Sequence, residues 1–336
     1  MKDALLYEQF QSGTVHCFLC AHGCKIPPNS FGICSVRQNF KGKLYTHAYG
    51  RVIAQQVDPV EKKPLYHFLP GTKTFSISTI GCNFKCGFCQ NWQISQLGAD
   101  QRGDRWGSEL TPQGAVELAQ KCGCGSISFT YTEPTIFFEY ALEICKLAKK
   151  QGISTIFVSN GYMSGEALKE ISPWLDACNI DLKSFSDRFY NKFCHARLEP
   201  VLNCLKTVAE SDIWLEITTL LVTGENDSSE ELELLASFIA RELGKDVPWH
   251  ISRFFPQYDM TDHSATPLYT IKNAEITGKK HGLRYIYPGN VSGPSDTVCF
   301  RCRATLVKRE GYDIQELWIR KGSCNQCGAE IAGVWH

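Results

Sequence analysis

The sequence predicts an α/β protein in which six strand–helix units form an open, partial barrel, with small Cys-rich metal-binding modules at both termini. Two observations support this fold class. From residue 74 onward, short β-rich segments alternate with amphipathic segments, and cysteine clusters lie before, within and after the alternating region. Such alternation implies a parallel sheet, because parallel strands need crossover connections. Six units are fewer than the eight of a closed barrel, and the site is expected at the carboxyl ends of the strands.

Six segments have the length and the β-branched or aromatic content of strands. They are TFSISTI (74–80), GSISFTY (125–131), ISTIFVS (153–159), WLDACNIDL (174–182), WLEITTLLV (214–222) and VPWHISRFF (247–255). Four segments between them carry apolar residues at helical spacing. They are Pro112–Cys122, Ile136–Lys150, Glu199–Ala209 and Ser229–Leu243. Ser229 and Glu230 predict a capped start for the last helix, and Leu283–Tyr287 is a candidate seventh strand at the edge.

The chain divides into three regions on this basis. Residues 1–73 are expected to form an irregular, Cys-rich N-terminal module, because Gly, Pro and polar residues leave few periodic segments. Residues 74–297 form the partial barrel. Residues 298–336 form a compact module, whose paired Cys-x2-Cys knuckles have the spacing of a zinc ribbon.

Composition excludes some classes of function. Lys and Arg total 35, as do Asp and Glu, so no net positive charge favours a nucleic-acid partner. Hydrophobic residues make up 43% of the 336 residues, which is enough for a core of ordinary size. The beginning of the chain does not resemble a signal peptide, and no apolar stretch has the length of a membrane span. We therefore expect a cytoplasmic protein without a membrane partner.

Seventeen cysteines are unusual for such a protein. A reducing cytoplasm disfavours structural disulfides, so clustered cysteines there indicate metal or redox chemistry. Eleven fall into three groups: Cys17, Cys20, Cys24 and Cys34; Cys82, Cys86 and Cys89; and Cys299, Cys302, Cys324 and Cys327. The other six are scattered and are interpreted as small buried hydrophobic residues. They are Cys122, Cys124, Cys145, Cys178, Cys194 and Cys204.

The central group is the most informative. Cys82, Cys86 and Cys89 follow directly after the first predicted strand with C-x3-C-x2-C spacing. A [4Fe–4S] cube normally takes four thiolates, so one short loop with three of them leaves the fourth iron open. An open iron is what a cluster needs in order to bind a substrate. The alternative, a zinc knuckle, lacks an obvious fourth ligand.

This motif, with the aromatic Phe88 before the last cysteine, resembles the signature of radical S-adenosylmethionine (SAM) enzymes. The resemblance implies a partial (β/α)6 TIM-like radical SAM barrel, a [4Fe–4S] cluster on the three cysteines, and SAM, with Phe88 beside its adenine. In that family the reduced cluster splits SAM into methionine and a 5′-deoxyadenosyl radical, which abstracts hydrogen from a substrate. The resemblance implies an oxidoreductase with no catalytic residue beyond the cluster ligands.

Residues at later strand ends resemble other segments of the family. Glu133, before Pro134, matches the residue that receives the SAM amino group. Asn160 lies in a segment resembling pyruvate formate-lyase activating enzymes, as do Asp181 and Lys183. Lys183 would meet the SAM carboxylate, and Asp181 would lie near the methionine moiety. The alternatives are an exposed helix-start glutamate for Glu133 and a same-face ion pair on one strand for Asp181 and Lys183.

A narrower resemblance concerns two further segments. Val57–His67, before the cluster loop, and Cys89–Trp92 resemble enzymes of the AmmeMemoRadiSam system, an activating-enzyme-like branch. The resemblance implies that a partner protein receives the radical, as in glycyl-radical activases, with Memo-like or AMMECR-type proteins as candidate partners. It also implies an electron donor such as flavodoxin or ferredoxin. The substrate itself does not follow from these motifs.

The two terminal quartets have different spacing. The C-terminal quartet, Cys299, Cys302, Cys324 and Cys327, has two Cys-x2-Cys knuckles, which favour structural zinc over a second iron–sulfur cluster. The N-terminal quartet, Cys17, Cys20, Cys24 and Cys34, is looser, and zinc, an iron–sulfur cluster and a metal-free loop all remain open.

A competing interpretation is a metal-rich electron-transfer or zinc-ribbon binding protein without SAM chemistry. The open-site spacing of the central cysteines and the order of the strand-end motifs both favour the enzyme.

Overall fold

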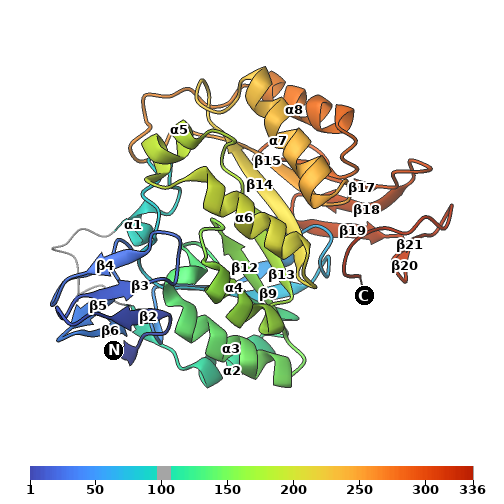
Figure 1. Ribbon diagram of the computed structural model, residues 1–336. Helices are drawn as coiled ribbons and strands as arrows, with labels where there is room; N and C mark the ends of the chain where they lie inside the picture. Colours follow the sequence, from blue (N-terminus) through green and yellow to red (C-terminus); the bar gives the residue numbers. More distant parts are fainter. Residues whose placement is uncertain (97–106, 336) are drawn as a thin grey trace.

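The computed structural model describes residues 1–96 and 107–335 (Figure 1). Residues 97–106, within the segment predicted as the barrel, and residue 336, the last of the predicted C-terminal module, lie outside the described residues. Among the described residues, no helix combines the length and the apolar character needed to cross a membrane.

An eight-stranded sheet forms the centre of the molecule, with the order β16-β15-β14-β13-β12-β11-β9-β8. Seven of its strands run parallel, each beside its neighbour in the chain. They are β9 (Lys73–Ser78), β11 (Ser126–Phe129), β12 (Ser154–Ser159), β13 (Ala177–Asp181), β14 (Trp214–Leu221), β15 (Trp249–Arg253) and β16 (Ile286–Gly289). The six predicted strands are confirmed, each shorter than expected. The seventh is also present, but it begins at Ile286 rather than Leu283.

One edge of this sheet differs from the prediction. Strand β8 (Ala54–Pro59) pairs antiparallel with β9, from Ala54 opposite Ser78 to Pro59 opposite Lys73. Its sequence, AQQVDP, has little β-branched character, and only Asp58 is fully buried. A terminal position on an edge strand tolerates Pro59, because no ladder hydrogen bond needs its missing N–H. The sheet therefore includes a strand from the segment assigned to the N-terminal module.

The four predicted helices are present and cover one face of the sheet (Figure 1). They are α2 (Pro112–Lys121), α3 (Phe138–Lys150), α6 (Leu198–Ala209) and α7 (Ser229–Phe238). Two of their ends differ from expectation. A 3-10 turn, η3 (Pro134–Phe137), precedes α3, and a π-helical turn, η6 (Ile239–Leu243), follows α7. The cap of α7 is Ser228, whose side chain accepts a hydrogen bond from the N–H of Glu231.

Four further helices were not predicted. They are α1 (Trp92–Ser95), α4 (Gly165–Ile171), α5 (Asp187–Phe189) and α8 (Leu268–Lys280). Helix α8 was missed because its apolar residues do not follow one stripe: Leu268, Tyr269 and Ile276 are all exposed. The other three are too short for periodicity to indicate them.

The two faces of the sheet pack against different sets of buried side chains. Phe157 and Cys178 belong to the large core that packs against the helices. Their neighbours Ile156 and Ala177 point to the opposite face, since side chains alternate along a strand. There they pack against Val60, Leu65 and Phe68, from the segment between β8 and β9. This segment, whose η1 turn covers Val60–Lys62, fills the face away from the helices.

The terminal regions form small antiparallel sheets at opposite ends of the large one (Figure 1). The N-terminal strands are β1 (Lys2–Asp3), β2 (Tyr7–Gln9), β3 (Val15–Cys17), β4 (Cys24–Ile26), β5 (Arg37–Phe40), β6 (Lys43–Thr46) and β7 (Arg51–Val52), the last paired with β10 (Ser108–Glu109). The C-terminal strands are β17 (Thr297–Val298), β18 (Thr305–Glu310), β19 (Asp313–Leu317), β20 (Ile319–Arg320) and β21 (Ser323–Cys324).

Candidate active site

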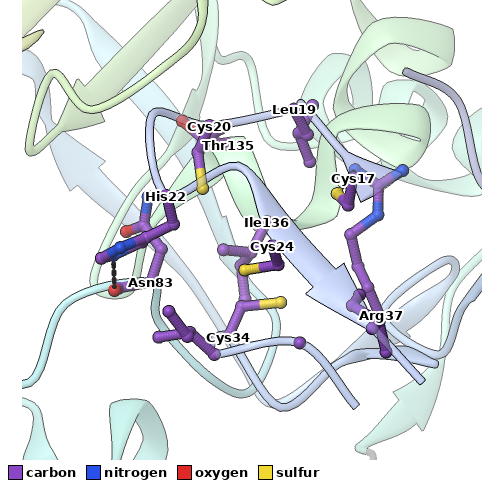
Figure 2. A pocket seen from close by; sticks show the side chains of 13 residues that line it. Cys17, Leu19, Cys20, His22, Cys24, Cys34, Arg37, Asn83, Thr135 and Ile136 are labelled. Carbon is purple, nitrogen blue, oxygen red and sulfur yellow. Dashed lines mark hydrogen bonds between the residues drawn. The ribbon is translucent and has the colours of Figure 1, made fainter. Parts of the chain in front are cut away.

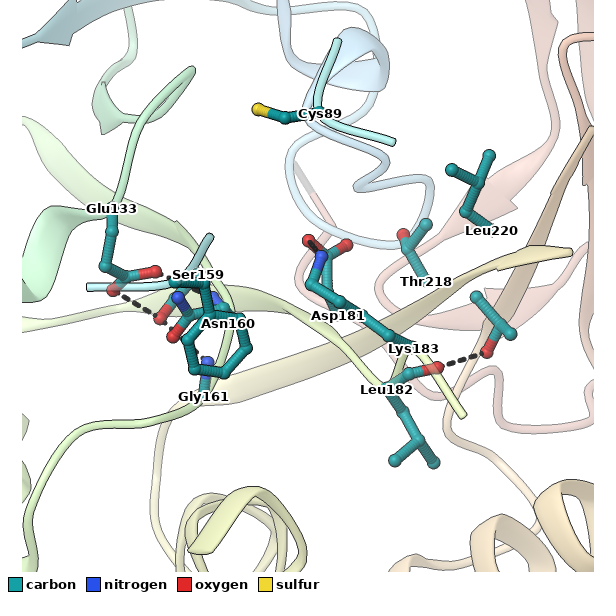
Figure 3. Close-up of polar contacts among 12 residues, drawn as sticks. Cys89, Glu133, Ser159, Asn160, Gly161, Asp181, Leu182, Lys183, Thr218 and Leu220 are labelled. Carbon is teal, nitrogen blue, oxygen red and sulfur yellow. Dashed lines mark hydrogen bonds and ion pairs between the residues drawn. The ribbon is translucent and has the colours of Figure 1, made fainter. Parts of the chain in front are cut away.

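The predicted site residues gather at the carboxyl edge of the parallel sheet. The loop with the central cysteines follows β9, Glu133 follows β11, Asn160 follows β12, and Lys183 follows β13. Because the carboxyl ends of parallel strands lie at one edge, side chains far apart in the chain meet there. Figure 3 shows Cys89, Glu133, Asn160 and the Asp181–Lys183 pair around this edge.

The central thiols have polar neighbours suited to thiolates. The N–H of Phe84 donates to Cys82 Sγ over 3.4 Å, and Asn160 Nδ2 lies 4.0 Å from the same sulfur. Cys89 Sγ and the Ser95 hydroxyl are 3.1 Å apart. Burial raises the pKa of the Cys82 and Cys89 thiols, and the Cys194 thiol together with burial raises that of Cys86; the pKa values of Cys82 and Cys86 lie well above the ordinary value. Without a metal they are therefore protonated, and metal binding must displace the protons. Three thiols on one loop with nearby donors fit a cluster ligand set.

Backbone contacts hold this loop in place. The N–H groups of Lys85 and Gly87 donate to the carbonyls of Cys194 and Phe193, both at 3.0 Å. These two acceptors lie in a π-helical turn, η5 (Tyr190–Cys194), which follows α5. π-helical turns occur frequently at functional sites. Cys194 is completely buried, and its thiol lies beside that of Cys86, where it raises the Cys86 pKa.

Three contributors to this site were missed from the sequence: Asn83, Ser95 and Cys194. Only Cys194 carried a signal, as one of the scattered cysteines. The structure brings it beside Cys86 in the cysteine loop, although its isolated position in the sequence had suggested only a small buried hydrophobic residue.

Glu133 is buried and makes several hydrogen bonds. Its Oε1 accepts from the Thr135 N–H at 3.0 Å, the Thr135 hydroxyl at 2.6 Å and the Ser159 hydroxyl at 2.8 Å. Its Oε2 accepts from the Asn160 N–H at 2.8 Å. Burial raises the pKa of this carboxyl, and the hydrogen bonds oppose the rise. Glu133 thus caps η3, but it is buried rather than exposed as the helix-start alternative expected, and it also holds Asn160 beside Cys82. One acceptor position remains on Oε2.

Asp181 and Lys183 form an ion pair, with Nζ and Oδ2 2.8 Å apart. The Lys183 ammonium also lies 5.7 Å from the ring centroid of Phe88. Burial alone would lower the pKa of Lys183, but Asp181 and the neighbouring thiols raise it well above the ordinary value. A charged lysine is therefore present beside the cysteine loop. Phe88 is itself buried, with its ring 5.7 Å from that of Phe189.

The C-terminal thiols form a second group. Cys299 and Cys327 have sulfurs 3.7 Å apart, and so do Cys302 and Cys324. All four sulfurs lie within 4.8 Å of one another. A single ion bound tetrahedrally at about 2.3 Å from each sulfur separates the sulfurs by about 3.8 Å. The group therefore has the dimensions of a mononuclear metal site.

The N-terminal thiols, Cys17, Cys20, Cys24 and Cys34, line a separate pocket beside the central loop (Figure 2). Asn83, which follows Cys82 in the chain, forms part of its wall.

The parallel sheet and the three-thiol loop at its carboxyl edge define the class of protein. Residues 76–238 match the model of the radical SAM superfamily. This segment, just under half of the chain, is a radical SAM domain. A domain of this family implies a [4Fe–4S] cluster and SAM as cofactors, and the three thiols described above fit such a cluster.

Individual relatives extend this result. An uncharacterised protein of Methanocaldococcus jannaschii is 40% identical over 335 residues, which cover 98% of this chain and 99% of that protein. A pyruvate formate-lyase-activating enzyme of Clostridium pasteurianum is 28% identical over 179 residues, 51% of this chain and 70% of the enzyme. A putative glycyl-radical enzyme activating enzyme of M. jannaschii is 24% identical over 183 residues, 53% of this chain and 66% of that protein.

Solved structures show the same fold. The radical SAM methyltransferase from Sphaerobacter thermophilus has a TM-score of 0.51 at 15% identity, over 66% of this chain and 67% of that one. SuiB from Streptococcus suis, bound to S-adenosylmethionine, has a TM-score of 0.51 at 14% identity, over 69% of this chain and 53% of that one.

Proposed function

We propose that this protein is a radical SAM activating enzyme, in which Cys82, Cys86 and Cys89 ligate the catalytic [4Fe–4S] cluster and SAM occupies the open iron. The observation that carries the proposal is the loop of three thiols at the carboxyl edge of the parallel sheet, with polar groups beside Cys82 and Cys89. Once bound, the cluster and SAM together supply a 5′-deoxyadenosyl radical.

The neighbouring side chains then have distinct roles in holding SAM. Lys183 offers its ammonium to the SAM carboxylate, and Asp181 keeps that ammonium charged and in place over 2.8 Å. Glu133 offers the remaining acceptor position on Oε2 to the SAM amino group and orients Asn160 through its N–H. Phe88 supplies an apolar surface for the adenine, since its side chain carries no polar group.

The proposed substrate is a glycine in a partner protein. The relatives named as activating enzymes support this class of substrate. The resemblance of Val57–His67 and Cys89–Trp92 to the AmmeMemoRadiSam branch makes Memo-like and AMMECR-type proteins the first partners to test. Flavodoxin or ferredoxin is the proposed electron donor.

Zinc is the metal we propose for the C-terminal quartet. The sulfur separations of 3.7 Å support a single tetrahedral ion over a second cube, because four irons and four sulfides hold their thiolates farther apart.

The proposed reaction is tested by anaerobic reconstitution with iron and sulfide, followed by SAM and dithionite. The wild-type protein should release 5′-deoxyadenosine, and the Cys82→Ala/Cys86→Ala/Cys89→Ala variant should release none. Cys122→Ala is the matched control, because Cys122 is exposed and lies outside all three clusters. Release of 5′-deoxyadenosine from the triple variant at the wild-type rate would refute the proposal.

The substrate is tested separately, with candidate partners carrying deuterated glycine. Deuterium recovered in 5′-deoxyadenosine supports the activase. Deuterium recovered from a small metabolite, with no partner protein present, contradicts it.

A further inference from the structure

The N-terminal pocket brings together four cysteines from β3, β4, the turn between these strands and the loop before β5. Cys17 ends β3, Cys20 lies in the following turn, Cys24 begins β4, and Cys34 lies in the loop before β5. Figure 2 shows the four side chains around the pocket. Cys17 and Cys34 are buried, and Cys20 and Cys24 are half-buried. Four thiols in an enclosed and mostly apolar space are a ligand set without an assigned role.

The dimensions of the pocket differ from those of the C-terminal quartet. Among the described residues, the four sulfurs of the C-terminal quartet all lie within 4.8 Å of one another, whereas the four sulfurs of the N-terminal quartet do not. One chain thus contains two four-cysteine sets of different size. The compact set matches a single tetrahedral ion. The sulfurs of the N-terminal set do not all lie within this distance of one another, and a polynuclear group holds its thiolates farther apart than a single ion does.

The pocket wall also carries hydrogen-bond donors. Arg37 is 1% exposed, and its Nη1 donates to Cys17 Sγ over 3.5 Å. Its Nη2 pairs with Glu139 of α3 over 2.5 Å, which anchors the N-terminal module on the barrel. Within the described part of the chain, Arg37 Nε is buried and has no hydrogen-bond partner. Because Glu139 already balances the charge of Arg37, what the guanidinium contributes beside the four thiols is hydrogen-bond donation.

Asn83 provides a second, independent donor. It is 1% exposed, and its Nδ2 is buried with no partner among the residues described. The orientation of its amide follows from the surrounding network. The Tyr162 N–H donates to Asn160 Oδ1 at 3.0 Å, so Asn160 presents its Nδ2 to Asn83 Oδ1, 2.7 Å away. The Asn83 Nδ2 therefore remains available on the pocket wall, and a buried donor of this kind normally has an acceptor.

We propose that Cys17, Cys20, Cys24 and Cys34 ligate a second iron–sulfur cluster of the [4Fe–4S] type, with Asn83 and Arg37 as donors to its sulfur atoms. This cluster has all four irons bound to thiolates, so unlike the central cluster it has no open iron for SAM.

The proposed cluster lies against the central loop. A Cβ built on Gly81 would meet the Cys34 carbonyl oxygen at 2.8 Å, and His22 Nε2 lies 2.8 Å from the Asn83 carbonyl oxygen. Asn83 lines the pocket, and its Oδ1 is 3.8 Å from Cys82 Sγ. The two cluster sites thus share the short segment from Gly81 to Asn83.

The test uses the full chain with the central ligands removed. After anaerobic reconstitution, the Cys82→Ala/Cys86→Ala/Cys89→Ala variant should retain about four irons and about four sulfides per chain. Adding Cys20→Ala and Cys24→Ala should remove both the iron and the sulfide, whereas adding Cys122→Ala should not.

Sulfide is the decisive quantity, because an iron ion bound by the C-terminal quartet brings none. A central-ligand variant without sulfide overturns the proposal, as does a sulfide content that loss of Cys20 and Cys24 leaves unchanged. The outcome is independent of SAM chemistry, since this background has no catalytic cluster.

A second measurement avoids the variants altogether. Mössbauer spectra of the wild-type protein reconstituted with 57Fe should show about eight irons per chain in cube-type clusters. Reduction should also produce magnetic interaction between the two clusters in electron paramagnetic resonance spectra, because their loops are in contact. About four cube-type irons per chain in the wild type would overturn the proposal.

Discussion

At the scale of single residues, the site depends on a few charged and polar groups that the fold makes close neighbours. Lys183 and Asp181 form an ion pair next to the cysteine loop, and Glu133 distributes its two oxygens among four donors. The three cysteines proposed as cluster ligands were predicted from their spacing and from the family signature that it resembles. Asn83 and Ser95 were not predicted, because Asn83 contacts Asn160 and Ser95 contacts Cys89 only in the folded loop.

Lys183→Ala should weaken SAM binding without loss of the central cluster. The substitution removes a charge-assisted contact worth about 1.5–3 kcal/mol, which corresponds to roughly a 10- to 150-fold loss of affinity. Equilibrium binding of SAM to the reconstituted protein measures the effect. Lys192→Ala is the matched control, since Lys192 is an exposed lysine paired with Glu225. Wild-type affinity in Lys183→Ala would place this residue outside the SAM site.

Glu133→Ala should lower both stability and SAM affinity. It leaves the buried N–H groups of Thr135 and Asn160 without their acceptor, at a cost of about 1–3 kcal/mol each. Chemical denaturation should show the loss of stability, and the same SAM titration should show the loss of affinity. If affinity alone is unchanged, Glu133 has only the capping role.

At the scale of elements, strand–helix alternation predicted the parallel sheet, but not its antiparallel edge strand β8 or helix α8. Propensity and periodicity are weak where an element is an edge or carries exposed apolar residues, as β8 and α8 do. The π-helical turn η5, which supports the cysteine loop, has no recognisable sequence pattern.

The turn between β9 and the cysteine loop requires glycine at position 81. Gly81 has φ +97°, and an added Cβ would lie 2.8 Å from the Cys34 carbonyl oxygen. Gly81→Ala should therefore destabilise the protein by more than the roughly 1–2 kcal/mol of left-handed strain alone, and it should lower the iron content. Gly123→Ala is the matched control, because Gly123 has φ +65° and a Cβ added there would meet no atom within 4 Å. Equal destabilisation of the two variants in urea would contradict the clash.

The η1 turn contains a buried acid that should make stability depend on pH. Burial raises the pKa of Glu61 from 4.5 to about 7. Between these values the folded protein binds the proton more tightly than the unfolded chain, so stability falls as pH rises from about 4.5 and levels off above about 7. Glu61→Gln keeps an acceptor for the Gly71 N–H and should remove up to about 3 kcal/mol of this fall. Unfolding free energies at pH 5 and pH 8 measure it. An identical pH dependence in both proteins would be inconsistent with the buried acid.

At the scale of the whole molecule, the terminal regions pack on the barrel at different places. The N-terminal module contacts α3 through the Arg37–Glu139 pair. The C-terminal module contacts the segment between β8 and β9 through His67. The His67 Nδ1 lies 2.7 Å from the Ala332 carbonyl oxygen, and the Val334 N–H donates to the His67 carbonyl oxygen. Loss of the metal proposed for either terminal region should therefore affect the central sheet as well as that region.

The C-terminal metal should be zinc that survives exposure to air. Elemental analysis of air-exposed protein should give about one zinc per chain, and Cys302→Ala/Cys324→Ala should lose it and lower the melting temperature, because structural zinc contributes directly to folding. Cys122→Ala again serves as the control. Iron in place of zinc, with inorganic sulfide that disappears in the double variant, would instead identify an auxiliary cluster.

The order of residues along the chain determined the sheet type, the position of the site at its carboxyl edge and the three central cysteines, because each depends on local spacing or strand–helix alternation. The tertiary structure alone decided which groups surround those cysteines. The Asn160–Asn83 contact joins residues 77 positions apart, and Cys194 reaches Cys86 across the sheet edge. The tertiary structure also distinguished the two terminal quartets by the distances between their sulfurs. These distances depend on how the loops fold and not on the number of residues between the cysteines.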